Sequence, residues 1–192
     1  MRYTVFCGSS SGTESFYQTE AYALGKAFSE RKIGLVYGGA RVGLMGAVAD
    51  GALDHQGEVI GVLPRFLKSV EIEHFRLTEL LIVESMHERK AKMDALSDGI
   101  VALPGGFGTL EEFFEMLTWA QLGLHQKPVA LLNILGFYDP LLVMIDEMVT
   151  KGFLKSSNKD MLVVANTIDE LLDKMEKYQA PTEGKWLDKR IL

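Results

Sequence analysis

The sequence has a single cysteine, Cys7, and no apolar stretch long enough to cross a bilayer. One cysteine excludes an internal disulfide, which is typical of proteins in a reducing compartment. A membrane-spanning helix needs about 20 apolar residues in a row, and the first ten residues, MRYTVFCGSS, lack the apolar core of a secretion signal. The sequence therefore predicts a cytoplasmic protein that does not enter a membrane.

Positive charge is also scarce. The 192 residues include 20 Lys and Arg against 26 Asp and Glu, which gives a net charge of −6, and there is no run of basic residues. Such a chain is a poor binder of nucleic acid polymers and of anionic membranes, because basic surfaces hold those polyanions. We expect any anionic ligand to be a small molecule that meets a local cluster of hydrogen-bond donors.

The composition that is present is that of a globular protein, with 47% hydrophobic and 24% charged residues. The length fits one domain that buries its own core. Short apolar runs alternate with longer amphipathic runs. The predicted strands are residues 3–7, 33–37, 59–63, 77–83, 100–103, 129–133 and 162–165, and the predicted helices are residues 14–31, 43–55, 86–97, 110–122, 139–151 and 168–178.

Strands without apolar–polar alternation, each followed by a helix, are typical of a parallel sheet that is covered on both faces. We therefore predict one doubly wound, Rossmann-like α/β domain over residues 1–180, with a mostly parallel sheet of about seven strands, and a C-terminal tail at residues 181–192. In such folds ligands bind outside the carboxyl ends of the strands. The strand-to-helix turns are thus the expected place of the chemistry.

Three of these turns are rich in glycine, and we name them in chain order. The first glycine turn is GSSSG at residues 8–12, the second is GGARVGLMG at 38–46, and the third is PGGFGT at 104–109. Glycine lets backbone N–H groups approach an oxyanion, and a helix N-terminus adds partial positive charge. Together the turns predict a nucleotide or sugar-phosphate site. Their spacings disfavour a dinucleotide-dependent oxidoreductase and a P-loop nucleoside triphosphatase.

Charged residues gather near these turns. Arg89 and Lys90 stand at the start of a predicted helix, where cations oppose the helix dipole, and an anionic ligand would offset that cost. Glu111 and Glu112 follow the third glycine turn. Adjacent carboxylates would repel a phosphate, but beside an anomeric carbon a carboxylate can stabilise an oxocarbenium-like transition state or activate water. Glu111 and Thr118 are seven residues apart and share one helix face.

Each group also has a purely structural alternative. Ser85 with Glu88, and Thr109 with Glu112, have the spacing of a capping box, so each glutamate could serve only its own helix. The 4 histidines are scattered without metal-ligand spacing. No metal site is predicted, and Mg²⁺ bound to substrate oxygens stays open.

The motifs MHERK at residues 86–90 and PGGFGTLEE at 104–112 resemble the LONELY GUY (LOG) family of cytokinin riboside 5′-monophosphate phosphoribohydrolases, long described as lysine decarboxylases. Similar segments run from VFCGS at 5–9 through YGG at 37–39 and GLMG at 43–46 to LTWAQLG at 117–123, so the resemblance covers nearly the whole chain. It implies hydrolysis of the N-glycosidic bond of a nucleoside 5′-monophosphate to free base and ribose 5-phosphate.

The resemblance also implies roles for single residues. Arg89 and Glu112 match the catalytic arginine and glutamate of the family. The matching substrate-binding positions are Glu71, Lys90, Gly105, Gly106, Gly108, Thr109, Glu111 and Thr118. We expect the third glycine turn to hold the 5′-phosphate, Glu112 to face the ribose and Arg89 to orient the substrate. Ala40 stands where the family commonly has a third consecutive glycine.

The resemblance implies a homodimer with sites near its interface. We also expect that no cofactor is required. A lysine decarboxylase that uses pyridoxal phosphate needs a Schiff-base lysine and a partner for the pyridinium nitrogen, and no lysine stands in such a context. The main alternative is a non-catalytic carrier of a nucleotide or of the molybdenum cofactor, which the presence of both Arg89 and Glu112 disfavours. The preferred base, a cytokinin or plain adenine, is left open.

Overall fold

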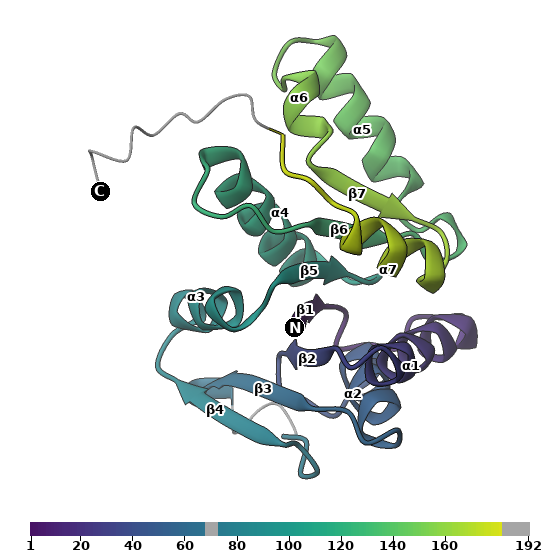
Figure 1. Cartoon of the computed structure of the whole chain (residues 1–192), viewed down its shortest axis with the longest axis vertical. Helices are drawn as coiled ribbons and strands as arrows, with labels where there is room; N and C mark the ends of the chain where they lie inside the picture. Colours follow the sequence, from purple (N-terminus) through teal and green to yellow (C-terminus); the bar gives the residue numbers. More distant parts are fainter. Residues whose placement is uncertain (68–72, 182–192) are drawn as a thin grey trace.

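The computed structural model describes residues 1–67 and 73–181 (Figure 1). The predicted binding residue Glu71 and residues 182–192 of the predicted tail lie outside the described residues. Seven strands form one sheet in the order β4-β3-β2-β1-β5-β6-β7, and every neighbouring pair is parallel. The predicted doubly wound α/β fold is confirmed.

Most elements begin and end within a few residues of their predicted limits, because short apolar runs mark them locally. The strands are β1 (Arg2–Phe6), β2 (Gly34–Tyr37), β3 (Val59–Pro64), β4 (Glu79–Val83), β5 (Gly99–Ala102), β6 (Val129–Leu132) and β7 (Leu162–Ala165). The helices are α1 (Ser15–Glu30), α2 (Gly43–Leu53), α3 (Met86–Leu96), α4 (Phe107–Leu122), α5 (Asp139–Thr150), α6 (Ser156–Lys159) and α7 (Ile168–Glu176), with short 3₁₀ turns η1 (Arg65–Leu67) and η2 (Ile134–Gly136).

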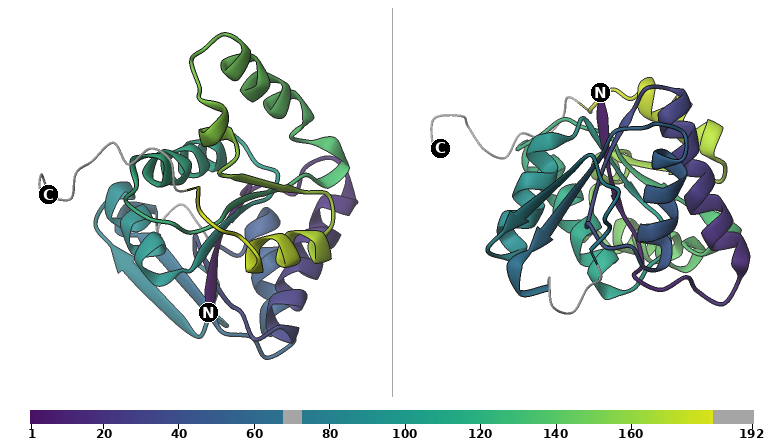
Figure 2. Two further views of the ribbon diagram at one scale, coloured as in Figure 1. Left: turned by 45° about the horizontal axis from the view of Figure 1, so that its top comes forward. Right: turned by 90° about the horizontal axis from the view of Figure 1, so that it is seen from below.

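Helices cover both faces of the sheet, as the right-hand view of Figure 2 shows. Helices α1, α2 and α7 bury side chains such as Leu24, Val48 and Leu171 against one face. Helices α3 and α4 bury Met93 and Phe113 against the other. Because both faces are buried, the strands are apolar at most positions, which explains the absence of alternation in the sequence.

The strand order reverses between β1 and β5, and this reversal places the site. The chain moves from β1 outward to β4, then crosses to β5 on the other side of β1 and continues to β7. The first and third glycine turns follow the two strands at the reversal, and the second follows β2 beside them. In open α/β sheets this is where ligands bind. No helix of the described residues has both the length and the apolar character to span a bilayer.

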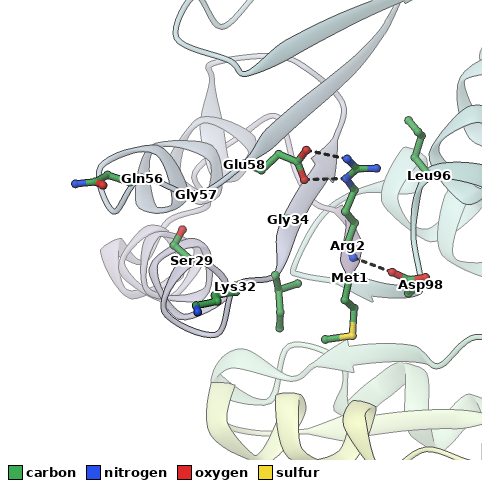
Figure 3. A pocket seen from close by; sticks show the side chains of 11 residues that line it. Met1, Arg2, Ser29, Lys32, Gly34, Gln56, Gly57, Glu58, Leu96 and Asp98 are labelled. Atoms are coloured by element: carbon green, nitrogen blue, oxygen red, sulfur yellow. Dashed lines mark hydrogen bonds and ion pairs between the residues drawn. The ribbon is translucent and has the colours of Figure 1, made fainter.

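A cavity of about 610 Å³ lies at the opposite, amino edge of the sheet (Figure 3). Arg2 and Glu58 meet in it through two hydrogen bonds of 2.8 Å, and the backbone N–H of Arg2 donates to Asp98 at 2.9 Å. Hydrogen bonding to Glu58 raises the pKa of Arg2 and lowers that of the carboxylate. Arg2 and Glu58 thus neutralise each other's charge. This cavity is therefore a weaker candidate for a reaction site than the carboxyl edge of the sheet.

His125 packs against helix α4 and makes the stability of the fold depend on pH. Its Nε2 lies 3.0 Å from the carbonyl oxygen of Met116, and its Nδ1 accepts the backbone N–H of Lys127 at 3.2 Å. A neutral ring with its proton on Nε2 satisfies both contacts. Burial lowers the pKa of His125 below its ordinary value. On acidification, the unfolded chain therefore takes up this proton before the folded protein does.

We expect the free energy of unfolding to fall as the pH drops below about 6.5, the ordinary histidine pKa, and to keep falling until the lowered pKa of the folded state is reached. Denaturant unfolding between about pH 8 and about pH 5.5 measures this dependence. The variant His125→Gln has no titrating ring, so its stability should change less over the same range. An equally steep decline in the variant would assign the pH dependence to other groups.

Candidate functional site at the carboxyl edge

The three glycine turns contact one another through their backbones. The N–H of Gly8 donates to the carbonyl oxygen of Pro104 at 3.0 Å, and the carbonyl oxygen of Gly8 accepts the N–H of Leu44 at 3.1 Å. Gly43 has a φ of +58°, and a Cβ there would lie 2.3 Å from the carbonyl carbon of Ser9. Only glycine fits so close an approach in this conformation. The turns therefore form one continuous surface.

Helix α4 begins earlier than the predicted residue 110. Its first residue is Phe107 and its N-cap is Gly106, and the N–H of Leu110 donates to the carbonyl oxygen of Gly106. Thr109 and Glu112 both lie inside the helix, so the alternative in which they form a capping box is wrong. The first N–H groups of a helix have no intrahelical acceptor. This helix end therefore presents free donors and a partial positive charge, which suit an anion.

A cavity of about 330 Å³ lies beside the start of α4. Its walls are the first glycine turn, the residues from Pro104 to Gly106, and two aromatic side chains, Tyr17 of α1 and Phe137 of the turn after β6. The two rings meet edge to face with their centroids 6.1 Å apart. A volume of this order is typical of small-molecule sites, at about 300–1,000 Å³.

Arg89 of α3 and Glu112 of α4 face each other at the same edge. Nη2 of Arg89 lies 3.5 Å from Oε1 of Glu112, and each side chain is less than one-tenth exposed, at 8% and 9%. Gly38, directly after β2, leaves room for the guanidinium, since a Cβ there would lie 2.4 Å from Nη2. Nε of Arg89 has no hydrogen-bond partner among the described residues.

Burying such a charged pair costs free energy that hydrophobic residues of the same size would not cost. A buried donor left without a partner, as Nε of Arg89 is, adds to that cost. Buried charged pairs and unpartnered buried donors are common at functional sites, where a ligand can provide the missing partner. The burial of the Arg89–Glu112 pair and the unpartnered Nε of Arg89 therefore make this pair the leading candidate for chemistry at this edge.

Cys7, the residue after β1, lies in the electrostatic field of this pair. Burial raises the pKa of the Cys7 thiol well above its ordinary value, the charge of Glu112 raises it further, and Arg89 opposes that rise. The thiol therefore stays protonated, and a protonated thiol is a poor nucleophile. Burial and protonation together disfavour a catalytic role for Cys7.

Lys90 lies in different surroundings from its neighbour Arg89. Its Nζ is 2.7 Å from Oε2 of Glu115 and also pairs with Glu111, and both carboxylates belong to α4. Burial alone would lower the pKa of Lys90, but the hydrogen bonds to the two carboxylates raise it above its ordinary value. The ammonium is thus already neutralised. In this structure Lys90 ties α3 to α4 and so holds Arg89 near the start of α4.

The structure brings most predicted site residues together. Around the start of α4 lie Arg89, Lys90, Gly105, Gly106, Gly108, Thr109, Glu111 and Glu112. Thr118 lies farther along α4, where its hydroxyl donates to the carbonyl oxygen of Phe114 at 2.7 Å. It lines a separate cavity of about 180 Å³ together with residues of α5 and α6. Glu71 is outside the described residues.

Three residues at this edge were missed from the sequence. Tyr17 and Glu115 stand inside helices, and no local pattern distinguishes them from packing or surface residues. Phe137 follows a predicted strand, so its place in a strand-to-helix turn is the one signal that could have found it. Within the described part of the chain, no group of three or more His, Cys, Asp and Glu side chains is arranged to hold a metal ion.

Known proteins resemble this chain in sequence over most of its length. The model of a family described as "Possible lysine decarboxylase" matches residues 45–175. The chain is 48% identical to cytokinin riboside 5′-monophosphate phosphoribohydrolase LOG of Oryza sativa subsp. japonica over 177 residues, which cover 92% of this chain and 73% of the rice protein. It is also 48% identical to the enzyme LOG3 of Arabidopsis thaliana, over 92% of this chain and 82% of that protein.

Solved structures with a similar fold are more distant in sequence. The molybdenum cofactor carrier protein of Chlamydomonas reinhardtii superposes with a TM-score of 0.69 at 21% identity, covering 92% of this chain and 96% of that one. The molybdenum cofactor binding protein of Rippkaea orientalis gives a TM-score of 0.68 at 19% identity, covering 91% and 94%. At such identities the likeness shows a shared fold and nothing about the ligand.

Gly105 and Gly108 offer a matched test of the start of α4. A Cβ on Gly105 would lie 2.1 Å from Oγ1 of Thr109, whereas a Cβ on Gly108 would meet no atom within 4 Å. We expect Gly105→Ala to destabilise the fold by about 1–3 kcal/mol, as overpacking does. Gly108→Ala should leave the stability close to that of the wild type.

Both variants should bind inorganic phosphate more weakly. At Gly105 the added Cβ would displace Thr109, and at Gly108 it would occupy the open space in which we expect the phosphate to lie. Thermal unfolding gives the stability, and calorimetric titration with phosphate gives the affinity. Wild-type affinity in Gly108→Ala would show that no anion approaches the backbone at the start of α4.

Proposed function

Because this chain belongs to the LOG family of cytokinin riboside 5′-monophosphate phosphoribohydrolases, we propose that it hydrolyses the N-glycosidic bond of a nucleoside 5′-monophosphate. The products are the free base and ribose 5-phosphate. Identity of 48% to LOG enzymes over 92% of the chain supports this activity. The family model is described as a possible lysine decarboxylase, whereas the relatives at 48% identity are named phosphoribohydrolases. The chain is an N-glycosyl hydrolase.

The observation that carries the proposal is the buried Arg89–Glu112 pair beside the open N-terminus of α4. The 5′-phosphate of the substrate takes the free N–H groups at the start of the helix. The ribose then lies over the first turns of α4, where the Glu112 carboxylate faces C1′. The anionic phosphate thus meets the positive end of the helix dipole, and C1′, which becomes positive in the reaction, meets the negative charge of Glu112.

In the reaction the bond between C1′ and the base nitrogen breaks, water adds its hydroxyl to C1′, and its proton ends on the departing base. Positive charge develops on the sugar as the base leaves. The carboxylate of Glu112 stabilises that charge or accepts the proton of the water. The guanidinium of Arg89, whose Nη2 lies 3.5 Å from that carboxylate, holds the carboxylate in place and orients the substrate.

A carrier of the molybdenum cofactor is the weaker alternative. It rests on structures that share 19–21% of their residues with this chain, and that likeness extends to the fold alone. The enzymes at 48% identity favour catalysis.

We further propose that the enzyme is a cytoplasmic homodimer of chains that each form one domain over residues 1–180, and that it needs no cofactor. The family resemblance supports the dimer, as do apolar side chains left exposed on the chain, among them Val143 and Met144 of α5. Analytical ultracentrifugation should show a dimer at micromolar concentration, and turnover should survive dialysis against EDTA. A monomer, or activity that returns only with Mg²⁺, would contradict these proposals.

The base that the enzyme prefers follows from kcat/KM for AMP compared with its N6-prenylated analogue. The names of the relatives, cytokinin riboside 5′-monophosphate phosphoribohydrolases, are the reason to expect a preference of this enzyme for the prenylated substrate. We expect release of both bases, with the larger kcat/KM for the analogue. Turnover of AMP alone would make adenine the substrate base.

The Glu112 carboxylate gives the sharpest prediction. Glu112→Gln keeps the shape of the side chain and removes its charge, so the rate of base release should fall by about 10²–10³. Arg89→Ala should lower the rate similarly and also destabilise the fold by about 3–5 kcal/mol, because it leaves a buried charge without its partner. The matched control is Glu147→Gln on α5, where the carboxylate pairs with the exposed Lys151.

Chromatography of the base released from AMP measures these rates, and circular dichroism checks the fold. The control should keep the full rate. Wild-type turnover in Glu112→Gln would reduce Glu112 to a packing role and remove the basis of the proposed mechanism.

A further inference from the structure

The turn between β6 and α5 reaches the carboxyl edge beside the third glycine turn, although no glycine–phosphate motif marks it. Tyr138 lies in this turn and is only 1% exposed. Its hydroxyl donates to the carbonyl oxygen of Leu103 at 2.6 Å. Leu103 is the residue directly before the third glycine turn. A buried side chain from a distant part of the sequence thus holds the root of that turn.

A second hydrogen bond fixes the next peptide group. The carbonyl oxygen of Pro104 accepts the N–H of Gly8 at 3.0 Å. In a planar trans peptide the N–H points away from the carbonyl oxygen. The direction of the Gly105 N–H is therefore set by the bond that its partner carbonyl makes. Together, the bonds at Leu103 and Pro104 hold the backbone that leads into α4 in place, and the bond at Pro104 also orients the N–H of Gly105.

Tyr138 is itself held in place. Its backbone N–H donates to Oδ1 of Asn133 at 2.7 Å, and Nδ2 of Asn133 donates to Oδ1 of Asp139, also at 2.7 Å. The backbone N–H of Asn133 donates to the carbonyl oxygen of Ala165 at 2.8 Å, which joins the turn to β7. Burial raises the pKa of Tyr138, so its hydroxyl keeps the proton that it donates.

We propose that Tyr138 is a positioning residue for the substrate phosphate: through the carbonyl of Leu103 its hydroxyl sets the position of the N–H groups at the start of α4. The inference rests on the proposed function, because it takes the ligand of those N–H groups to be the 5′-phosphate of a nucleotide. Tyr138 does not touch the substrate, and its effect should appear in phosphate affinity rather than in the chemistry at C1′.

The test compares Tyr138→Phe with Tyr3→Phe, and each variant loses only a hydroxyl group. Tyr3 is a matched control because it is equally buried, at 3% exposed, and its ring packs against Phe28 on the face covered by α1. The probes are ribose 5-phosphate, titrated by calorimetry, and the turnover of AMP and of adenosine, which lacks the phosphate. Thermal unfolding of both variants gives the structural cost.

We expect Tyr138→Phe to bind ribose 5-phosphate about fivefold to tenfold more weakly, which is the net effect of one hydrogen bond. The KM for AMP should rise by a similar factor. We expect the wild type to turn over adenosine more slowly than AMP, and Tyr138→Phe to leave that slower rate unchanged. Tyr3→Phe should match the wild type in both affinity and KM.

Wild-type affinity for ribose 5-phosphate in Tyr138→Phe would overturn the positioning role, whatever the thermal stability of the variant. Equal losses with AMP and with adenosine would also overturn it, because they would indicate a general structural role. A wild-type protein that binds ribose 5-phosphate but hydrolyses no nucleotide would refute the proposed function, and the titrations would still decide the role of Tyr138. A wild-type protein that does not bind ribose 5-phosphate would refute both.

Discussion

The site depends on one constraint, the close backbone approach of the first glycine turn to the other two. Gly8 donates to Pro104 and accepts from Leu44, and Gly43 lies against the backbone of Ser9. These contacts exist because the strand order reverses between β1 and β5, which brings the ends of distant segments together. Side chains at the contacts would push the turns apart. Because glycine has no side chain, the turns can approach each other and the N-terminus of α4 stays accessible to a ligand.

The second physical feature is the electrostatic arrangement of α3 against α4. Arg89 and Glu112 form one buried pair, and the next residue, Lys90, pairs with Glu111 and Glu115. The two neighbouring cations thus have separate roles. Lys90 links α3 to α4 through the two carboxylates. Arg89 lies with Glu112 at the edge where the ribose is expected.

How far the sequence predicts this site depends on the range of each interaction. Strand runs and the Ser85 cap are local, and the predicted cap is confirmed, since Oγ of Ser85 accepts the N–H of Glu88 at 3.1 Å. The start of α4 was placed too late, because Gly106 caps the helix without a side-chain signal. The bond from Tyr138 to Leu103 joins residues far apart in the chain, and no spacing indicates it. The proposed roles of Arg89 and Glu112 rest on the family resemblance, and only the fold brings the two side chains into contact.

The central claim is that one nucleotide lies with its phosphate on the start of α4 and its anomeric carbon at residue 112. The most direct measurement is a crystal structure of the Glu112→Gln variant with AMP bound. We expect the phosphate oxygens to accept the N–H groups of residues 106–109, and C1′ to be in contact with the side chain at position 112. A nucleotide in the cavity at the amino edge, or one whose base rather than phosphate meets the start of α4, would contradict it.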